Sequence, residues 1–155
     1  MIVRLSVVPV IGDSRRSSAY ETVFAMNILP ADRVPIVLVV EDQGIERLAA
    51  VEMLRYAGFG TVDVGSGAEA VLALEEIKNI QIMVTDIDLD RGINGIVLAA
   101  CVDRRWPTVG IVMTSGKVQP LLGDVPSRAL FLPKPYNEAN MLAAVRGLIR
   151  DCGSR

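Results

Sequence analysis

Three aspartates stand at alternate positions in the stretch IMVTDIDLDRG, residues 82–92, directly after an apolar and β-branched run. These acids are Asp86, Asp88 and Asp90. Carboxylates crowded at the end of a buried strand repel one another, and the repulsion is stronger where water is excluded. We therefore expect a metal ion, a lysine or a reaction at one of the carboxylates to offset this charge.

Further side chains capable of chemistry follow three other apolar runs of the chain: Glu41 and Asp42, Thr114 and Ser115, and Lys134. The chain has only three lysines, so one held between two prolines after an apolar run is informative. Clustered carboxylates without histidine suit a hard, oxygen-binding cation such as Mg²⁺. Beside such an ion a carboxylate can attack a phosphoryl group, while a hydroxyl and an ammonium hold the other phosphoryl oxygens.

The composition excludes several other classes of function. No histidine occurs among the 155 residues, so Ser-His-Asp triads, Cys-His pairs and His-ligated zinc are excluded. The two cysteines, Cys101 and Cys152, form neither a zinc site nor a disulfide scaffold and fit a reducing cytoplasm. A net charge of −2 without basic clusters argues against nucleic acid as a partner. No apolar stretch reaches the ~20 residues of a membrane span, so we expect no membrane partner.

The chain is long and apolar enough for one domain with a sizeable core, since 51% of its residues are hydrophobic. Short apolar runs predict strands at residues 36–40, 61–64, 82–86, 109–114 and 129–132. The helical periodicity between them predicts an α/β fold with a doubly wound, five-stranded parallel sheet and helices on both faces. In such folds the functional site lies at the carboxyl ends of the strands, where all the residues above would meet.

The helices are indicated by spacing and by capping residues. After the first strand, apolar residues recur at helical spacing and Gly58 follows them as a C-cap: Ile45, Leu48, Ala49, Met53 and Tyr56. Ser66 and Glu69 have the spacing of a capping box, and Asn137 is placed to cap the last helix. Residues 117–127 contain two prolines, so the helix expected between the last two strands is short or missing.

Three segments are expected along the chain. Residues 1–34 lack clear periodicity and contain the polar loop GDSRRSSAYE, so we expect an irregular or partly disordered N-terminal extension. This extension is either an addition upstream of a true start at Met26 or an arm that packs on the domain or on a neighbour. Residues 35–151 form the domain, and residues 152–155 are a short tail.

From about residue 35 to residue 150 the chain resembles the receiver domains of two-component response regulators, of the single-domain type. Four motifs carry the resemblance: VVEDQ at 39–43, VTDIDL at 84–89, IVMTSG at 111–116 and FLPKPY at 131–136. Their intervals also fit, with 44 residues from Asp42 to Asp86, 28 from Asp86 to Thr114 and 20 from Thr114 to Lys134. Any one motif is weak, but four in this order form a strong signal. The resemblance implies a flavodoxin-like strand order of 2-1-3-4-5.

The resemblance implies a role for each acidic residue of the site. Asp86 accepts the phosphoryl group and also contacts Mg²⁺. Asp42 binds Mg²⁺ directly, and Glu41 acts on the ion largely through water. Asp88, two residues after the acceptor, offers its backbone carbonyl to the metal.

The resemblance also implies roles for residues near the last two strands. Thr114 contacts a phosphoryl oxygen in the active state, and Lys134 pairs with the phosphoryl group, or with Asp86 before reaction. Phe131 matches the aromatic switch position, whose ring turns inward when Thr114 moves. The Lys134–Pro135 bond is expected to be cis.

The implied function is a stand-alone signalling switch in the bacterial cytoplasm, because no second domain follows residue 150. A sensor histidine kinase or a histidine phosphotransfer protein would phosphorylate Asp86. The domain would catalyse its own phosphorylation and dephosphorylation and would not be a metabolic enzyme. Its output surface, residues 117–136 and the last helix, would bind an unknown downstream protein, with a homodimer as a further option.

Two departures from the family pattern keep alternatives open. The first is the loop after Asp86, which lacks the usual proline and is slightly longer, with Gly92 and Gly95 supplying flexibility. The second is the segment 117–127, which is short. A degenerate receiver that only binds partners is one alternative. A phosphatase of the haloacid-dehalogenase type, suggested by the Asp86-x-Asp88 pair, is another, although that family places the pair on its first strand and has a cap domain. Each residue alone also has an ordinary interpretation as core or solvated surface.

Overall fold

The computed structural model describes residues 34–90, 92–117, 120 and 123–152. The predicted extension, residues 1–34, and the predicted tail, residues 152–155, lie outside the described residues, apart from residue 34 and residue 152. Everything that follows concerns the described residues.

Five parallel strands form one sheet in the order β2-β1-β3-β4-β5, which confirms the flavodoxin-like order. The strands are β1 (Ile36–Val40), β2 (Gly60–Val64), β3 (Ile80–Asp86), β4 (Gly110–Ser115) and β5 (Leu130–Pro133). β1 has the predicted bounds, and the other four differ from the predicted strands by one or two residues at their ends. The central position of β3 places its carboxyl end, with Asp86, in the middle of the rim.

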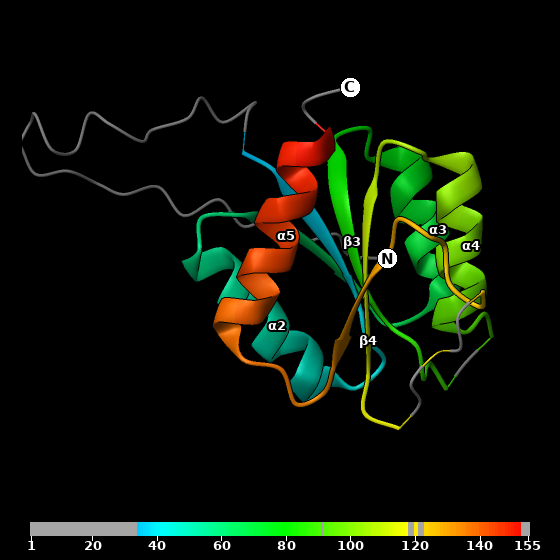
Figure 1. Cartoon of the computed structure of the whole chain (residues 1–155), viewed down its shortest axis with the longest axis horizontal. Coiled ribbons are helices and arrows are strands. Elements are labelled where there is room, and N and C mark those ends of the chain that lie inside the picture. The colour runs from blue at the N-terminus through cyan, green and yellow to red at the C-terminus, as the bar shows by residue number, and fades with distance from the viewer. Residues whose placement is uncertain (1–33, 91, 118–119, 121–122, 153–155) are drawn as a thin grey trace, which may run out of the picture.

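Four helices cover the sheet on both faces, as predicted. Figure 1 shows α2 (Gly44–Tyr56) and α5 (Glu138–Cys152) on one face, and α3 (Gly67–Glu76) and α4 (Gly95–Arg105) on the other. Side chains of β1 alternate between the two cores: Val37 and Val39 pack under α2 and α5, whereas Leu38 and Val40 pack under α3 and α4. Burial on both faces explains why the strands read as continuous β-branched runs. In the described part of the chain, no helix combines the length and the apolar character needed to cross a membrane.

The connection between β4 and β5 carries no helix among its described residues, which agrees with the prediction of a short or missing helix. Arg128 ties this connection to the end of α4. Its Nη1 donates to the carbonyl oxygens of Pro107 and Val109, each at 2.9 Å, and its Nε pairs with Asp103. One guanidinium thus satisfies carbonyl groups beyond the C-terminus of α4 and fixes the chain just before β5.

Helix α2 begins where expected but buries a different stripe from the one that the apolar spacing indicated. Ile45 and Tyr56 are each 87% exposed, while the buried residues are Ala50, Val51 and Leu54. Apolar residues lie on nearly opposite sides of this helix, and periodicity alone does not decide which side meets the sheet.

The predicted helix caps are largely present. Asn137 accepts a hydrogen bond from the N–H of Asn140 at 2.8 Å, and Ser66 accepts one from the N–H of Glu69 at 3.3 Å. The carboxylate of Glu69 accepts from the N–H of Gly65 at 2.9 Å, where a capping box would have it accept from residue 66. This cap helps to shape the loop after β2, next to the acidic rim.

Gly95 sets the distance between the end of β3 and the start of α4. Its N–H donates to the carbonyl oxygen of Ile87 at 3.1 Å, and a Cβ atom placed on it would lie 2.0 Å from the carbonyl oxygen of Asp86. Asn94 caps the same helix by accepting from the N–H of Val97 at 2.9 Å. The sequence suggested flexibility for this glycine, but its role in the structure is close approach to the backbone of β3.

We predict that Gly95→Ala lowers the free energy of unfolding by roughly 2 kcal/mol or more, because the methyl group has no space beside the β3 backbone. Urea unfolding monitored by circular dichroism measures the change. Gly147→Ala in α5 is the matched control, since a Cβ atom placed on Gly147 would meet no neighbouring group within 4 Å. That control should gain about 0.5–1 kcal/mol from helix propensity. Equal stabilities for the two variants would contradict the close approach.

Candidate functional site

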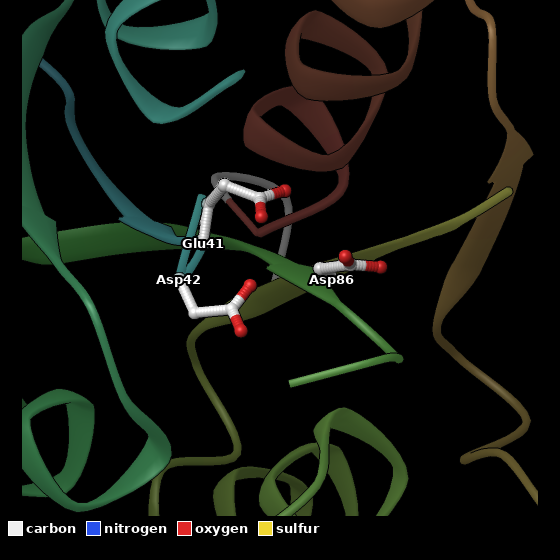
Figure 2. Close-up of side chains that lie close together, drawn as sticks. All are labelled: Glu41, Asp42 and Asp86. Atoms are coloured by element: carbon white, nitrogen blue, oxygen red, sulfur yellow. The ribbon is translucent and has the colours of Figure 1, made fainter. Parts of the chain in front are cut away.

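Three carboxylates meet at the carboxyl ends of β1 and β3. Glu41 and Asp42 follow β1 directly, and Asp86 is the last residue of β3 (Figure 2). One carboxylate oxygen from each residue lies within 4.8 Å of the others, and both Glu41 and Asp86 are buried. The sheet order brings these acids together, because β1 and β3 are neighbours with aligned carboxyl ends.

Lys134 reaches this rim from the loop after β5. Its Nζ lies 2.7 Å from Glu41 Oε2 and 3.1 Å from Asp86 Oδ2, and a third carboxylate, that of Glu46 on α2, lies at 2.6 Å. The predicted cis bond between Lys134 and Pro135 is present. The ammonium therefore offsets part of the repulsion that the sequence indicated, and all three of its protons have acceptors.

The environment shifts the pKa values of these groups in ways that follow from burial and pairing. Burial raises the pKa of Glu41 above its ordinary value of 4.5, although the hydrogen bond from Lys134 opposes the rise. For Lys134, burial lowers the pKa, but hydrogen bonds to Glu41, Glu46 and Asp86 outweigh burial and raise it. Lys134 thus stays charged and donates hydrogen bonds to all three carboxylates.

Asp42 stands at the more open side of the cluster. Its Oδ2 accepts a hydrogen bond from the backbone N–H of Asp90 at 3.0 Å. Burial would raise the pKa of Asp42, but this hydrogen bond and others around the carboxylate outweigh burial and lower it. The loop after β3 thereby holds Asp42 as an anion.

Two hydroxyl groups lie at the end of β4, the strand next to β3. Thr114 pairs in register with Asp86, is buried, and donates to the carbonyl oxygen of Thr85 at 3.4 Å. Ser115 donates to Oδ2 of Asp88 at 2.8 Å. The Asp88 side chain therefore turns toward β4 and lies outside the carboxylate group around Glu41, so any contribution of Asp88 to a metal remains with its backbone carbonyl, as the resemblance implied.

Phe131 lies on the edge strand β5, where it pairs in register with Met113, the residue before Thr114. It is half-buried and packs against the core under α3 and α4. The structure thus places Phe131 one strand away from Thr114, and its role as a switch stays a prediction.

Sequence reasoning missed two residues of α2 that contact the site. Glu46 pairs with Lys134, and Nη1 of Arg47 donates to the carbonyl oxygen of Glu41 at 2.7 Å while its Nε lies 3.3 Å from Asp63 Oδ2. The only local signal for Glu46 was an acid in the first helical turn, which the helix dipole explains equally well.

The donor set fits a hard divalent cation. Glu41, Asp42 and Asp86 supply only carboxylate oxygens, and the chain has no histidine to favour a softer metal. Asp86 Oδ1 accepts the N–H of Asp88 at 3.3 Å, yet each carboxylate oxygen has two lone pairs and keeps capacity for a metal. The acids present therefore suit Mg²⁺ at the open side of the cluster.

We predict that Lys134→Met destabilises the magnesium-free protein by roughly 1–3 kcal/mol near pH 8, because buried Glu41 and Asp86 lose their shared cation. The penalty should shrink toward about pH 4. Without Lys134 the pKa of Glu41 rises further, so the folded state binds its proton more tightly than the unfolded state, and stability falls as pH rises above the ordinary value of 4.5.

Urea unfolding at several pH values measures this dependence. Lys117→Met, which removes an exposed lysine, is the matched control and should show no such slope. A penalty for Lys134→Met that does not vary with pH would contradict the pairing described above.

Comparison with known proteins gives the family. The model of the response regulator receiver domain matches residues 37–146. A response regulator receiver protein from Sinorhizobium medicae WSM419 is similar, with a TM-score of 0.72 and 27% identity over 79% of this chain and 99% of that one. The Vibrio cholerae chemotaxis protein CheY4 has the same fold, with a TM-score of 0.67 and 19% identity over 74% of this chain and 97% of that one.

A curated relative extends the similarity to a larger protein. The chain is 26% identical over 117 residues to the sensor kinase CckA of Brucella abortus (strain 2308), which covers 73% of this chain but only 12% of that kinase. The resemblance first indicated by the four motifs is thereby confirmed over most of the described fold. This chain belongs to the response regulator receiver domain family of two-component signalling.

Proposed function

We propose that the domain catalyses magnesium-dependent transfer of a phosphoryl group from a sensor histidine kinase or a histidine phosphotransfer protein to Asp86. The observation that carries this proposal is the setting of Asp86. Its buried carboxylate lies beside Glu41 and Asp42 and 3.1 Å from the ammonium of Lys134. Receiver family membership favours the same chemistry.

In the proposed reaction an oxygen of Asp86 attacks the phosphorus atom and the phosphorus–nitrogen bond of the donor histidine breaks, leaving an acyl phosphate. Asp42 and Asp86 would hold Mg²⁺ directly, Glu41 largely through water, and Asp88 by its carbonyl. When bound, the ion supplies positive charge that offsets the carboxylates and the phosphoryl oxygens. Lys134 holds one phosphoryl oxygen, as its position beside Asp86 allows.

Phosphorylation is proposed to bias a switch made by Thr114 and Phe131. The hydrogen bond of Thr114 to the carbonyl of Thr85 is long, at 3.4 Å, so the hydroxyl can exchange it for a phosphoryl oxygen at small cost. Phe131, on the neighbouring strand, then turns inward into the space that Thr114 leaves. The changed surface of β5 and α5 binds a downstream protein or a second copy of the chain.

The proposal describes a signalling protein of the bacterial cytoplasm and not a metabolic enzyme. Because the 155 residues contain no histidine, the phosphoryl donor is a histidine of another segment or protein, or a small phosphodonor. Within the chain we assign residues 35–151 to the receiver, residues 1–34 to an extension and residues 152–155 to a tail.

A second candidate is a receiver that binds partners without phosphorylation. The connection between β4 and β5, which carries no helix among its described residues, favours it, since this side of the domain differs from the family pattern. A haloacid-dehalogenase-type phosphatase finds no support, because Asp86 lies on the third strand of the described chain and not on the first.

We predict that Mg²⁺ stabilises the protein by about 1.4 kcal/mol at ten times its dissociation constant, because only the folded state assembles the carboxylates. Asp42→Asn should abolish most of this gain. Asp124→Asn, in the exposed connection before β5, is the matched control and should keep it. Thermal unfolding with and without Mg²⁺ measures the effect, and an equal gain in all three proteins would place the ion elsewhere.

We predict that acetyl phosphate or phosphoramidate with Mg²⁺ adds one phosphoryl group to the intact protein. Asp86→Asn should prevent the addition, Asp124→Asn should leave it unchanged, and omission of Mg²⁺ should suppress it. Intact mass spectrometry measures each case. A folded wild-type protein that never gains a phosphoryl group would favour a receiver that binds partners without phosphorylation. Steady turnover of small phosphate esters would instead favour the haloacid-dehalogenase-type phosphatase.

A further inference from the structure

Glu46 makes a contact that the proposed phosphoryl transfer does not use. It lies in the first turn of α2, yet its Oε2 is 2.6 Å from Nζ of Lys134, which is 88 residues away in sequence. Glu46 is outside the carboxylate group of Glu41, Asp42 and Asp86 that suits a metal ion. Among the described residues, Lys134 is the side chain with which the Glu46 carboxylate pairs.

The ammonium of Lys134 has three protons, and three carboxylates already accept from it. A phosphoryl oxygen that binds this ammonium must therefore displace one of them. Asp86 carries the phosphoryl group, and Glu41 is buried and also accepts the N–H of Gln43 at 3.1 Å. The side chain of Glu46 is 46% exposed, so it regains water most readily when it leaves.

The surroundings of Glu46 leave space for this movement. A hollow of about 500 Å³ opens beside the ion pair and is lined by Glu46, Lys134 and small residues such as Ala49 and Gly116. This open space and the partial exposure of Glu46 leave room for its side chain to turn away from Lys134 toward solvent. The departure of Glu46 needs only side-chain rotation.

We propose that Glu46 is a displaceable positioning residue. Its carboxylate accepts the third hydrogen bond of the Lys134 ammonium in the unphosphorylated protein and gives up this bond when a phosphoryl group is attached to Asp86. This inference rests on the proposed function at Asp86. A carboxylate at position 46 opposes phosphorylation, because it competes for Lys134 and because its charge repels the phosphoryl oxygens. Glu46 thereby sets how easily this receiver is switched on.

The first test is the affinity for beryllium fluoride, which coordinates a carboxylate oxygen and mimics a phosphoryl group. At saturating Mg²⁺, Glu46→Gln should tighten binding roughly three- to tenfold relative to the wild type, because the neutral amide competes less for Lys134. Glu52→Gln, which removes a charge from the same helix but pairs with Arg55, should leave the affinity unchanged.

The second test observes Lys134 directly by NMR of isotopically labelled lysine side chains. The chain has three lysines, so Lys78→Arg and Lys117→Arg assign the remaining signal by elimination. The Lys134 signal should differ between wild type and Glu46→Gln in the free proteins, and should coincide once beryllium fluoride is bound. Coincidence in the bound state is a readout that a merely structural role of Glu46 would not produce.

Three outcomes overturn the inference. Unchanged or weaker binding of beryllium fluoride to Glu46→Gln shows that Glu46 does not compete for Lys134. Distinct Lys134 signals in the two bound proteins show that Glu46 stays on the lysine. A folded wild-type protein that neither binds beryllium fluoride nor gains a phosphoryl group refutes the proposed function, and the inference about Glu46 with it. If the wild type binds beryllium fluoride but Glu46→Gln binds it no more tightly, only the inference about Glu46 is refuted.

Discussion

Repulsion among carboxylates at one rim of the sheet is the constraint on which this structure depends. Glu41 and Asp86 are buried, so water does little to screen their charges, and Lys134 is the cation that the described structure provides for them. The lysine acts from the opposite end of the domain sequence, so its position depends on the pairing of β5 with β4 and on the loop that follows. The site therefore exists only when the whole sheet is assembled.

The fold meets this constraint by simple means. A parallel sheet places the carboxyl ends of β1, β3 and β4 at one edge, which brings acids and hydroxyls together without any long-range sequence signal. Gly95 lets α4 start close against β3, and Arg128 fixes the connection that leads into β5. A site so crowded with like charge costs stability, as functional sites commonly do.

The sequence predicted the sheet well because burial on both faces leaves a strong and local signal, the continuous β-branched run. It predicted the wrong face of α2, because apolar residues such as Ile45 and Leu54 lie on opposite sides of the helix and only packing against the sheet selects between them. It missed Glu46 because an acid in a first helical turn already has an ordinary explanation, and a contact across 88 residues has no local pattern. The roles of Asp86, Thr114 and Phe131 remain predictions that the geometry supports.

The central claim is that Asp86 is the residue that carries the phosphoryl group. Reduction of the phosphorylated protein with borohydride converts an aspartyl phosphate to homoserine, and peptide mass spectrometry then identifies the converted position. The account predicts homoserine at position 86 alone, and only in protein first incubated with a phosphodonor and Mg²⁺. Conversion at Asp42, Asp88 or another acid, or a phosphoryl group that resists this reduction, would contradict it.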